Sequence, residues 1–518
     1  MPNDEFGDFQ TPLALAEQCL RIVGLPTDAR VLEPTCGLGA FLHASADLQP
    51  GTERVGIEIQ PEYAEQASQW ARVSVGNIFV TDLAKDVEWQ TSGPIRIVGN
   101  PPWVTSAELN RMDSDNLPPK ENFKGAKGFD ALLGGSNFDV CEYIILKCLG
   151  DLRKEPLQLA MLCKTQVARN VIEHAAAAKL PVASASVYRI DAKRWFGAAV
   201  DACLFVVTAD PNNAPDYTVE VFEDVFTPEA EPTSRFGVVD GRLVSDVDGY
   251  LAVREADGVS SLVWRSGLKH DASKVFELDA APEPTTAQGA ALDVESEYVF
   301  PLLKCTDIFR GKHRALRKWV LVPQTTFGAD TSHLAMVAPK LWDYLNSNAE
   351  VLDGRKSSIY RNRPRFSVFG HGDYTYAPYK VAVSGLHKEA VFRLVAPIQG
   401  QPVVLDDTCY FLPFNDGTEA AIVAAELNSP AAQLLIESLV FWDSKRPITK
   451  KLLARIDLAK LPTDSDAILR GAQAVAEETG IKFDTERALS LVRQSGAPQY
   501  EDTVRPAQAA SENHQTRR

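Results

Sequence analysis

The residue types best suited to chemistry gather at 100–103, where Asn-Pro-Pro-Trp follows the apolar run 95–98 and a glycine. A β-branched run closed by glycine and proline predicts a buried strand that stops abruptly. Two successive prolines force an extended backbone and donate no N–H group. The Asn100 amide, the backbone carbonyls and the Trp103 ring then suit a flat, amino-bearing group, because carbonyls accept from an NH₂ and the ring stacks on its face. The alternative is a strand that ends in a polyproline turn with a core tryptophan.

A second motif lies upstream and is suited to hold a cofactor. A short strand at 30–32 leads into a turn and then an amphipathic helix, and the turn reads Glu33, Pro34, Thr35, Cys36, Gly37, Leu38, Gly39. Its two glycines let a ligand approach the backbone closely. The third glycine of the dinucleotide-binding pattern is missing, since Ala40 follows directly. The turn therefore suits a ligand without a pyrophosphate, and S-adenosylmethionine is the candidate.

An acidic residue stands where a ribose would need one. The next expected strand covers 54–59 and carries Glu58 near its end, about twenty positions after the glycine turn. In a doubly wound sheet a carboxylate at this position can accept from both ribose hydroxyls. We therefore expect Glu58 to bind the ribose of the cofactor. The alternative is a solvated strand end.

The two motifs, with Asn100 following Gly39 by 61 residues, resemble those of the amino-group DNA methyltransferases. Among these the chain is most similar to the TaqI-like gamma group, which methylates the 6-amino group of adenine. The resemblance covers residues 5–208. It implies an α/β fold with a Rossmann-like class I methyltransferase sheet, whose last strand runs antiparallel, and a C-terminal mixed α+β target-recognition domain.

The resemblance also implies roles for further residues. Phe9 and Thr11 belong to the motif that folds over the methionine end of the cofactor, although by chemistry alone this stretch is a simple helix cap. Asn77 stands where the family usually has an acid that accepts from the adenine amino group of the cofactor, and Ile78 lies beside it. Trp195 and Phe196 resemble the second aromatic motif, which packs around the target base, and Phe196 is the matching residue; the alternative for both is packing in the core.

The mechanism implied is direct, in-line methyl transfer to an adenine flipped out of the duplex. Asn100 and the Pro101 carbonyl would accept the two amino hydrogens, Pro102 belongs to the same corner, and Trp103 would stack on the base. Such a site works by positioning and hydrogen bonding rather than by a strong base. The Pro-Cys motif of the cytosine-carbon enzymes is absent.

Composition is ordinary for a soluble protein, with 45% hydrophobic and 24% charged residues. No apolar run approaches the ~20 residues of a membrane span, and the start lacks a signal peptide. Eight scattered cysteines without a Cys-x-x-Cys pair favour a reducing compartment and no metal site. We expect a cytoplasmic, nucleoid-associated protein of bacterial type.

The net charge of −16 is unevenly distributed along the chain. Residues 211–300 hold 6 Lys or Arg against 18 Asp or Glu, whereas residues 301–460 hold 21 against 15. Local charge matters more than the total for a polyanionic ligand. We expect a catalytic domain at 1–212, an acidic connecting region at 213–300, a DNA target-recognition domain at 301–463, and a helical segment with a frayed tail at 464–518.

Basic clusters in the C-terminal half and in a long loop at 104–135 are expected to contact phosphates. Each cluster alone is commonly a solvated face. The expected DNA-binding residues are Lys124, Lys127, Arg314, Arg361, Arg363, Arg365, Lys445 and Arg446.

The sequence thus predicts an adenine-specific DNA methyltransferase in a restriction-modification or related defence setting. Its partners would be double-stranded DNA and, in such a setting, a separate restriction endonuclease, since the chain carries no convincing nuclease motif. The alternatives are an amino-cytosine DNA methyltransferase, a methyltransferase acting on RNA or on a protein glutamine, and a catalytically silent DNA-recognition subunit.

Overall fold

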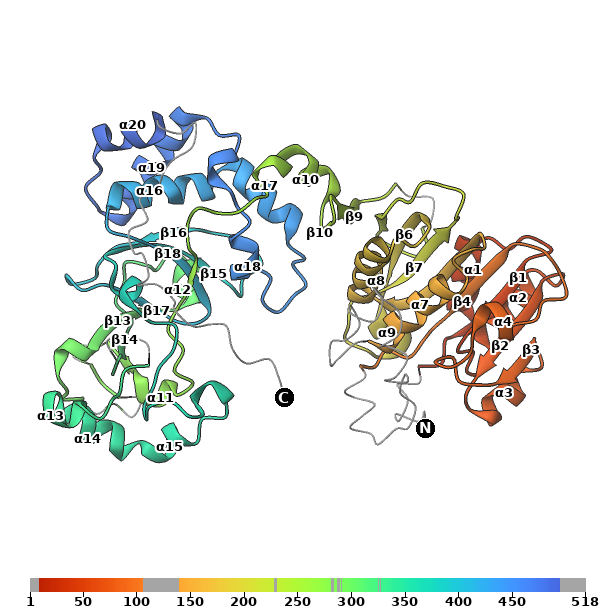
Figure 1. Ribbon diagram of the computed structural model, residues 1–518, viewed down its shortest axis with the longest axis horizontal. Helices are drawn as coiled ribbons and strands as arrows, with labels where there is room; N and C mark the ends of the chain where they lie inside the picture. The colour runs from red at the N-terminus through yellow and green to blue at the C-terminus, as the bar shows by residue number, and fades with distance from the viewer. Residues whose placement is uncertain are drawn as a thin grey trace. The chain divides into compact units, whose positions relative to one another are not determined.

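The computed structural model describes residues 9–105, 139–227, 231–280, 284–286, 289, 291–324, 326 and 328–493. The chain forms two compact units, and the division falls between Asp248 and Gly249 (Figure 1). We call them unit 1 and unit 2 and describe each by itself.

Unit 1 is built on a ten-stranded sheet with the order β10-β9-β8-β6-β7-β5-β4-β1-β2-β3. The strands are β1 (Arg30–Glu33), β2 (Glu53–Glu58), β3 (Arg72–Val75), β4 (Ile95–Gly99), β5 (Leu157–Lys164), β6 (Val182–Ile190), β7 (Ala202–Ala209), β8 (Thr218–Phe222), β9 (Ser234–Val239) and β10 (Arg242–Val244). Strands β1 to β5 pair in parallel with one another, and β7 pairs antiparallel with both β5 and β6. The expected Rossmann-like sheet with a reversed strand is confirmed.

Helices cover both faces of this sheet, as alternating strands and helices require. They are α1 (Leu13–Val23), α2 (Ala40–Leu48), α3 (Pro61–Ala67), α4 (Leu83–Asp86), α7 (Val140–Asp151), α8 (Thr165–Ala178) and α9 (Ala192–Phe196), while α10 (Val247–Val253) spans the junction of the units. Helices α1 and α2 pack against Val31, Val98 and Leu162 in one core cluster. Cys163 follows Leu162 in β5, so its side chain points to the other face of the sheet, where it contacts Cys141 of α7. Helix α7 therefore lies on the face opposite to α1 and α2.

The structure divides the chain differently from the sequence prediction of a connecting region at 213–300. Strand β8 pairs parallel with β6, and β9 and β10 follow as an antiparallel pair, so the sheet continues past the expected boundary at 212. Charge was a poor guide here, because the acidic residues sit at exposed positions between buried apolar ones, as Glu220 does between Val219 and Val221.

The residues that follow Gly249 are held within unit 2 by a buried ion pair. Asp257 accepts from Arg455 Nε at 2.9 Å and Nη2 at 2.7 Å, and from the Tyr250 hydroxyl at 2.8 Å. The Asp257 carboxylate is removed from water and needs such full pairing, whereas the Arg455 side chain is partly exposed. The second half of the expected connecting region is therefore part of unit 2.

Unit 2 has mixed α+β architecture with two four-stranded sheets, β11-β18-β15-β16 and β12-β14-β13-β17. The strands are β11 (Arg265–Ser266), β12 (Glu277–Asp279), β13 (Val299–Leu303), β14 (Lys318–Leu321), β15 (Tyr379–Ser384), β16 (Arg393–Val395), β17 (Val404–Leu405) and β18 (Cys409–Phe414). The helices are α11 (Ser273–Phe276), α12 (Cys305–Phe309), α13 (Leu334–Val337), α14 (Pro339–Ser347), α15 (Ala349–Asp353), α16 (Gly417–Leu427), α17 (Pro430–Leu439), α18 (Lys450–Leu453), α19 (Ser465–Thr479) and α20 (Thr485–Arg493).

The helical part of the segment expected at 464–518 is present as α19 and α20, and the expected frayed tail lies outside the described residues. Among the helices that the structure describes, none combines the length and the apolar character that a membrane crossing needs.

Candidate active site

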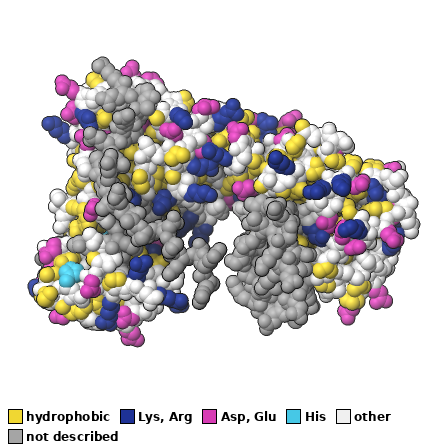
Figure 2. All heavy atoms as spheres, in the orientation of Figure 1, with side chains coloured by type: hydrophobic (Ala, Val, Ile, Leu, Met, Phe, Trp, Pro, Cys, Tyr) yellow, Lys and Arg dark blue, Asp and Glu magenta, His cyan; other side chains and the backbone are white. Residues whose placement is uncertain are grey.

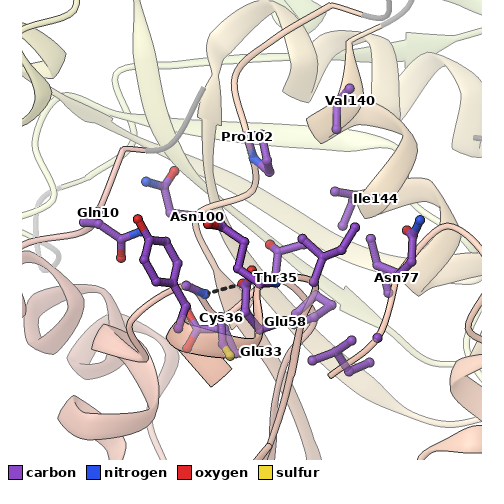
Figure 3. A pocket seen from close by; sticks show the side chains of 18 of the residues that line it. Gln10, Glu33, Thr35, Cys36, Glu58, Asn77, Asn100, Pro102, Val140 and Ile144 are labelled. Carbon is purple, nitrogen blue, oxygen red and sulfur yellow. Dashed lines mark hydrogen bonds between the residues drawn. The ribbon is translucent and has the colours of Figure 1, made fainter. Parts of the chain in front are cut away.

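A pocket opens where the order of the sheet reverses, between β1 and β4, at the carboxyl ends of the parallel strands. Such a switch point is the common ligand site of open α/β sheets. The cavity measures about 920 Å³, including the solvent at its mouth. Figure 3 shows Gln10 and Asn100 at one end and Asn77 with Ile144 at the other. The lining residues include Phe9, Thr11, Glu33, Pro34, Thr35, Cys36, Gly37, Glu58, Asn77, Ile78, Asn100 and Pro102.

The pocket therefore collects nearly all of the residues expected to bind a cofactor, and Gly39 is the exception. Gly39 has φ of 82°, and a Cβ there would lie 2.9 Å from Cβ of Ala67 in α3. Gly37 has φ of 52°, and its Cβ would lie 2.9 Å from Gln10 Oε1. Both positions need glycine for conformation and space. Gly39 thus shapes the turn and packs on α3 rather than lining the cavity.

Glu58 lies at the end of β2 beside the glycine turn and is 6% exposed. Its Oε2 accepts from the Gly37 N–H at 2.8 Å and its Oε1 from the Gln60 N–H at 2.9 Å. A carboxylate oxygen can accept more than one hydrogen bond. The same side chain can therefore hold the turn and still bind a ligand hydroxyl.

Glu33 ends β1 and is only 3% exposed. Burial raises the pKa of its carboxyl well above the usual range, and the nearby Glu58 carboxylate adds to the effect. Its Oε2 is buried and has no hydrogen-bond partner among the described residues. A buried carboxyl with one unpartnered oxygen inside a pocket is suited to a cationic ligand group, because the cation would stabilise its ionised form.

The far end of the pocket combines one amide with apolar side chains. Asn77 Oδ1 accepts from the Phe79 N–H at 3.0 Å, and the Phe79 ring packs edge-on against Tyr143 with centroids 5.4 Å apart. Ile78 is buried beside them, and Ile144 of α7 closes the wall. The arrangement suits a flat heteroaromatic ring, and the oxygen expected to accept from it is already shared with a backbone amide.

Asn100 follows β4 and its side-chain amide has one defined orientation. Nδ2 donates to the Phe9 carbonyl at 2.9 Å. The Asn100 Oδ1 atom is buried and has no partner among the residues that the structure describes. The site therefore presents a pre-positioned acceptor, which is the group needed to bind an amino hydrogen.

Three aromatic rings pack together beside this amide. The Trp103 centroid lies 5.9 Å from that of Phe9 and 5.2 Å from that of Phe196, and Phe9 and Phe196 are 6.1 Å apart. Trp103 is 6% exposed, and its indole N–H donates to the Leu162 carbonyl at 3.3 Å. Pro101, Trp103 and Phe196 are not among the residues that line the cavity. Trp103 is thus a core residue, as the alternative interpretation of the sequence expects, and its stacking on a base stays a prediction.

The expected DNA contacts fall into three groups. Lys124 and Lys127 lie outside the described residues. Arg314 donates to the Glu478 carbonyl at 2.7 Å, Arg365 pairs with Asp353 at 2.9 Å, and Arg446 lies 3.8 Å from Asp407. Arg361, Arg363 and Lys445 are exposed. Figure 2 shows Lys and Arg side chains interspersed with acidic ones on the visible face.

Sequence reasoning missed Gln10, which lines the pocket and whose Oε1 accepts from the Leu38 N–H at 3.1 Å. Its position between two expected contacts, Phe9 and Thr11, was the available signal. It also missed the wall formed by Val140 and Ile144, whose spacing of four places them on one face of α7. Among the described residues, no three His, Cys, Asp or Glu side chains gather as a metal site.

No protein-family model matches the chain. It is 38% identical over 475 residues to the type II methyltransferase M.NspV of a Nostoc species, a match covering 88% of this chain and 97% of the relative. It is 31% identical over 100 residues to the type II methyltransferase M.CvrRI of a Paramecium bursaria Chlorella virus, covering 19% of this chain and 25% of that one. Among solved structures, the type IIL restriction-modification enzyme MmeI in complex with DNA aligns with a TM-score of 0.45 at 12% identity, over 93% of this chain and 75% of that one.

Proposed function

Because the chain belongs to the type II methyltransferases, for which S-adenosylmethionine is the cofactor, we propose that it methylates the 6-amino group of adenine in double-stranded DNA. The setting proposed is a restriction-modification system with a separate restriction endonuclease. The observation that supports an amino group as the methyl acceptor is the Asn100 amide, because its buried Oδ1 can accept a hydrogen bond and has no donor among the described residues.

The pocket fits the cofactor by the chemistry of its lining. The buried Glu33 carboxyl suits the ammonium of the methionine end, Glu58 suits the ribose hydroxyls, and Asn77 with Phe79 suits the adenine ring. Phe9 and Thr11 would complete the methionine end. When bound, S-adenosylmethionine supplies an electrophilic methyl group on a sulfonium.

The chain's own residues would then orient the target amino group. Asn100 Oδ1 accepts one amino hydrogen and the Pro101 carbonyl accepts the other. These bonds draw the nitrogen lone pair out of conjugation with the ring and hold it for in-line attack. After methyl transfer the adenine amino nitrogen loses one proton, either to Asn100 Oδ1 or the Pro101 carbonyl, or directly to water.

The aromatic trio suits the flipped base. Flipping costs a few kcal/mol, and stacking on an aromatic ring returns about 1–3 kcal/mol per base. Phe196 is partly buried and Phe9 is 38% exposed, whereas Trp103 is 6% exposed, so Phe9 and Phe196 are the rings of the trio that are more open to an incoming base. Unit 2, with Arg361, Arg363 and Lys445 exposed, is proposed to contact the phosphates.

Nucleoside mass spectrometry after incubation with S-adenosylmethionine carrying a labelled methyl group tests the proposal. Labelled N6-methyladenine in duplex DNA is expected from the wild type and not from Asn100→Ala. Labelled N4-methylcytosine would overturn the choice of base. Label in RNA or protein alone would overturn the choice of DNA as the substrate. No label in any substrate would overturn the proposed activity and favour the alternative of a catalytically silent DNA-recognition subunit.

A further inference from the structure

The short segment that precedes α1 contacts two parts of the candidate active site at once. The Gln10 side chain accepts from the Leu38 N–H of the glycine turn at 3.1 Å. The Phe9 carbonyl accepts from the Asn100 Nδ2 at 2.9 Å. In Figure 3 the side chains of Gln10 and Asn100 lie at the same end of the pocket.

These two contacts are mechanically joined. The carbonyl of Phe9 and the N–H of Gln10 belong to one peptide group, which is planar and rigid. A displacement of Gln10 therefore tilts the carbonyl that holds Asn100. The contact with the turn is also close, because a Cβ on Gly37 would lie 2.9 Å from Gln10 Oε1 and 3.0 Å from Nε2.

The residue proposed to hold the ribose of the cofactor contacts the same turn. Glu58, the proposed ribose ligand, accepts from the Gly37 N–H at 2.8 Å, and Gln10 accepts from the next residue along the chain. Cofactor binding that fixes Gly37 thereby fixes the partner of Gln10.

The orientation of the Asn100 amide depends on the Phe9 carbonyl. An amide turned by 180° would set its oxygen against that carbonyl, and two acceptors repel each other. With the carbonyl in place, Oδ1 is the atom presented to a target amino group. With the carbonyl tilted away, both orientations become accessible and the acceptor is present for only part of the time.

We infer that Gln10 is a positioning residue that couples cofactor binding to acceptance of the target base, through the Phe9 carbonyl and the Asn100 amide. The inference rests on the proposed function. Residues 9 and 10 would then couple the binding of S-adenosylmethionine to that of DNA, in addition to contacting the cofactor.

The test uses full-length Gln10→Met, which keeps the length of the side chain but removes the acceptor, and Gln10→Glu, which keeps an acceptor oxygen. Gln66→Met, on the exposed side of α3, is the matched control. The DNA probe is a duplex containing the methylated sequence mapped in an expressing host, with 2-aminopurine at the target position. Its affinity is measured with and without sinefungin, a non-reactive analogue of the cofactor.

For wild type, Gln66→Met and Gln10→Glu, we expect sinefungin to tighten DNA binding by a factor in the usual coupling range of about 5–150. For Gln10→Met we expect that factor to fall towards 1, and kcat to fall more than KM for DNA rises. An unchanged factor in Gln10→Met, no coupling in the wild type, or equal losses in Gln10→Met and Gln10→Glu would overturn the inference. The proposed function fails separately, if the wild type yields no N6-methyladenine.

Discussion

The Glu58 carboxylate accepts the backbone N–H of Gly37 at 2.8 Å, so the residue proposed to hold the ribose also holds the glycine turn. We predict that Glu58→Ala weakens S-adenosylmethionine binding by about 1.5–3 kcal/mol, the worth of hydrogen bonds to a charged group. Glu58→Gln keeps an acceptor for Gly37 and should lose less. Calorimetry measures both changes.

The control for this prediction is Glu62→Ala, which removes an exposed carboxylate from the first turn of α3. It should leave the affinity unchanged. If Glu58→Ala is folded and binds the cofactor as tightly as Glu62→Ala does, Glu58 has no part in cofactor binding.

Glu33 predicts a pH dependence of the stability of unit 1. Its pKa in the folded protein is raised by burial above the ordinary value of 4.5. Above pH 4.5 the unfolded chain therefore releases a proton that the folded protein keeps, and stability falls as pH rises until the folded pKa is passed. Glu33→Gln should gain stability over the wild type by ~1.4 kcal/mol per pH unit in that window and nothing below pH 4.5.

Hydrogen exchange of the β1 and β4 amides measures this effect, because it reports on the opening of unit 1 alone. Glu62→Gln is again the exposed control. A wild-type stability that rises between pH 4.5 and neutrality relative to Glu33→Gln would mean that the Glu33 carboxylate is stabilised by a cation rather than destabilised by burial.

Much of unit 1 was predictable because its sequence signals are local. The apolar run at 95–98, closed by glycine and proline, predicted β4, and the glycine turn and the Asn100 motif marked the carboxyl ends of β1 and β4. Doubly wound topology then brings those ends together, so the pocket followed from the order of the strands.

What the sequence did not reveal depends on contacts between distant residues. The bond from Asn100 to Phe9 spans 91 positions, and no local pattern encodes it. The continuation of the sheet through β8 was hidden by acidic residues on its exposed side. Which basic residues of unit 2 are paired, as Arg365 is with Asp353, also follows only from the fold.

The basic residues of unit 2 predict a salt dependence. Each phosphate contact contributes about −0.9 to the slope of log K against log salt. The double variant Arg361→Gln, Lys445→Gln removes two exposed cations and should flatten the slope by about 2. Arg365→Gln should flatten it less, because Asp353 already neutralises that guanidinium.

Fluorescence anisotropy with a labelled duplex over a series of salt concentrations measures the slope. The double variant Arg470→Gln, Lys482→Gln makes the same charge change at exposed positions outside the basic clusters. Equal slopes for the two double variants would place Arg361 and Lys445 away from DNA.

We predict that a substitution at Asn100 slows the chemical step without preventing the binding of either substrate. Asn100→Ala removes the acceptor but replaces no residue of the glycine turn or of unit 2, so both substrates should still bind. Loss of one pre-positioned hydrogen bond in an active site commonly costs about 100- to 1,000-fold in kcat. Single-turnover methylation measures the chemical step, and a wild-type rate in Asn100→Ala would exclude the amide from the reaction.

The aromatic trio yields the last prediction, which must separate stacking from stability. Trp103 is 6% exposed and donates to Leu162, so Trp103→Ala would open a cavity and cost about 3–5 kcal/mol of stability. Phe196 is only partly buried, so Phe196→Ala removes a ring from the base without emptying the core. We expect Phe196→Ala to make the free energy of base flipping less favourable by about 1–3 kcal/mol, so that fewer bases are flipped. We expect Trp103→Phe to keep most of the flipped population. The control is Phe226→Ala, which removes an exposed ring that stacks on Trp195, a residue outside the trio. Fluorescence of 2-aminopurine at the target position reports flipping. If Phe196→Ala and Phe226→Ala flip the base equally well, the trio is a packing cluster, and the target base stacks elsewhere.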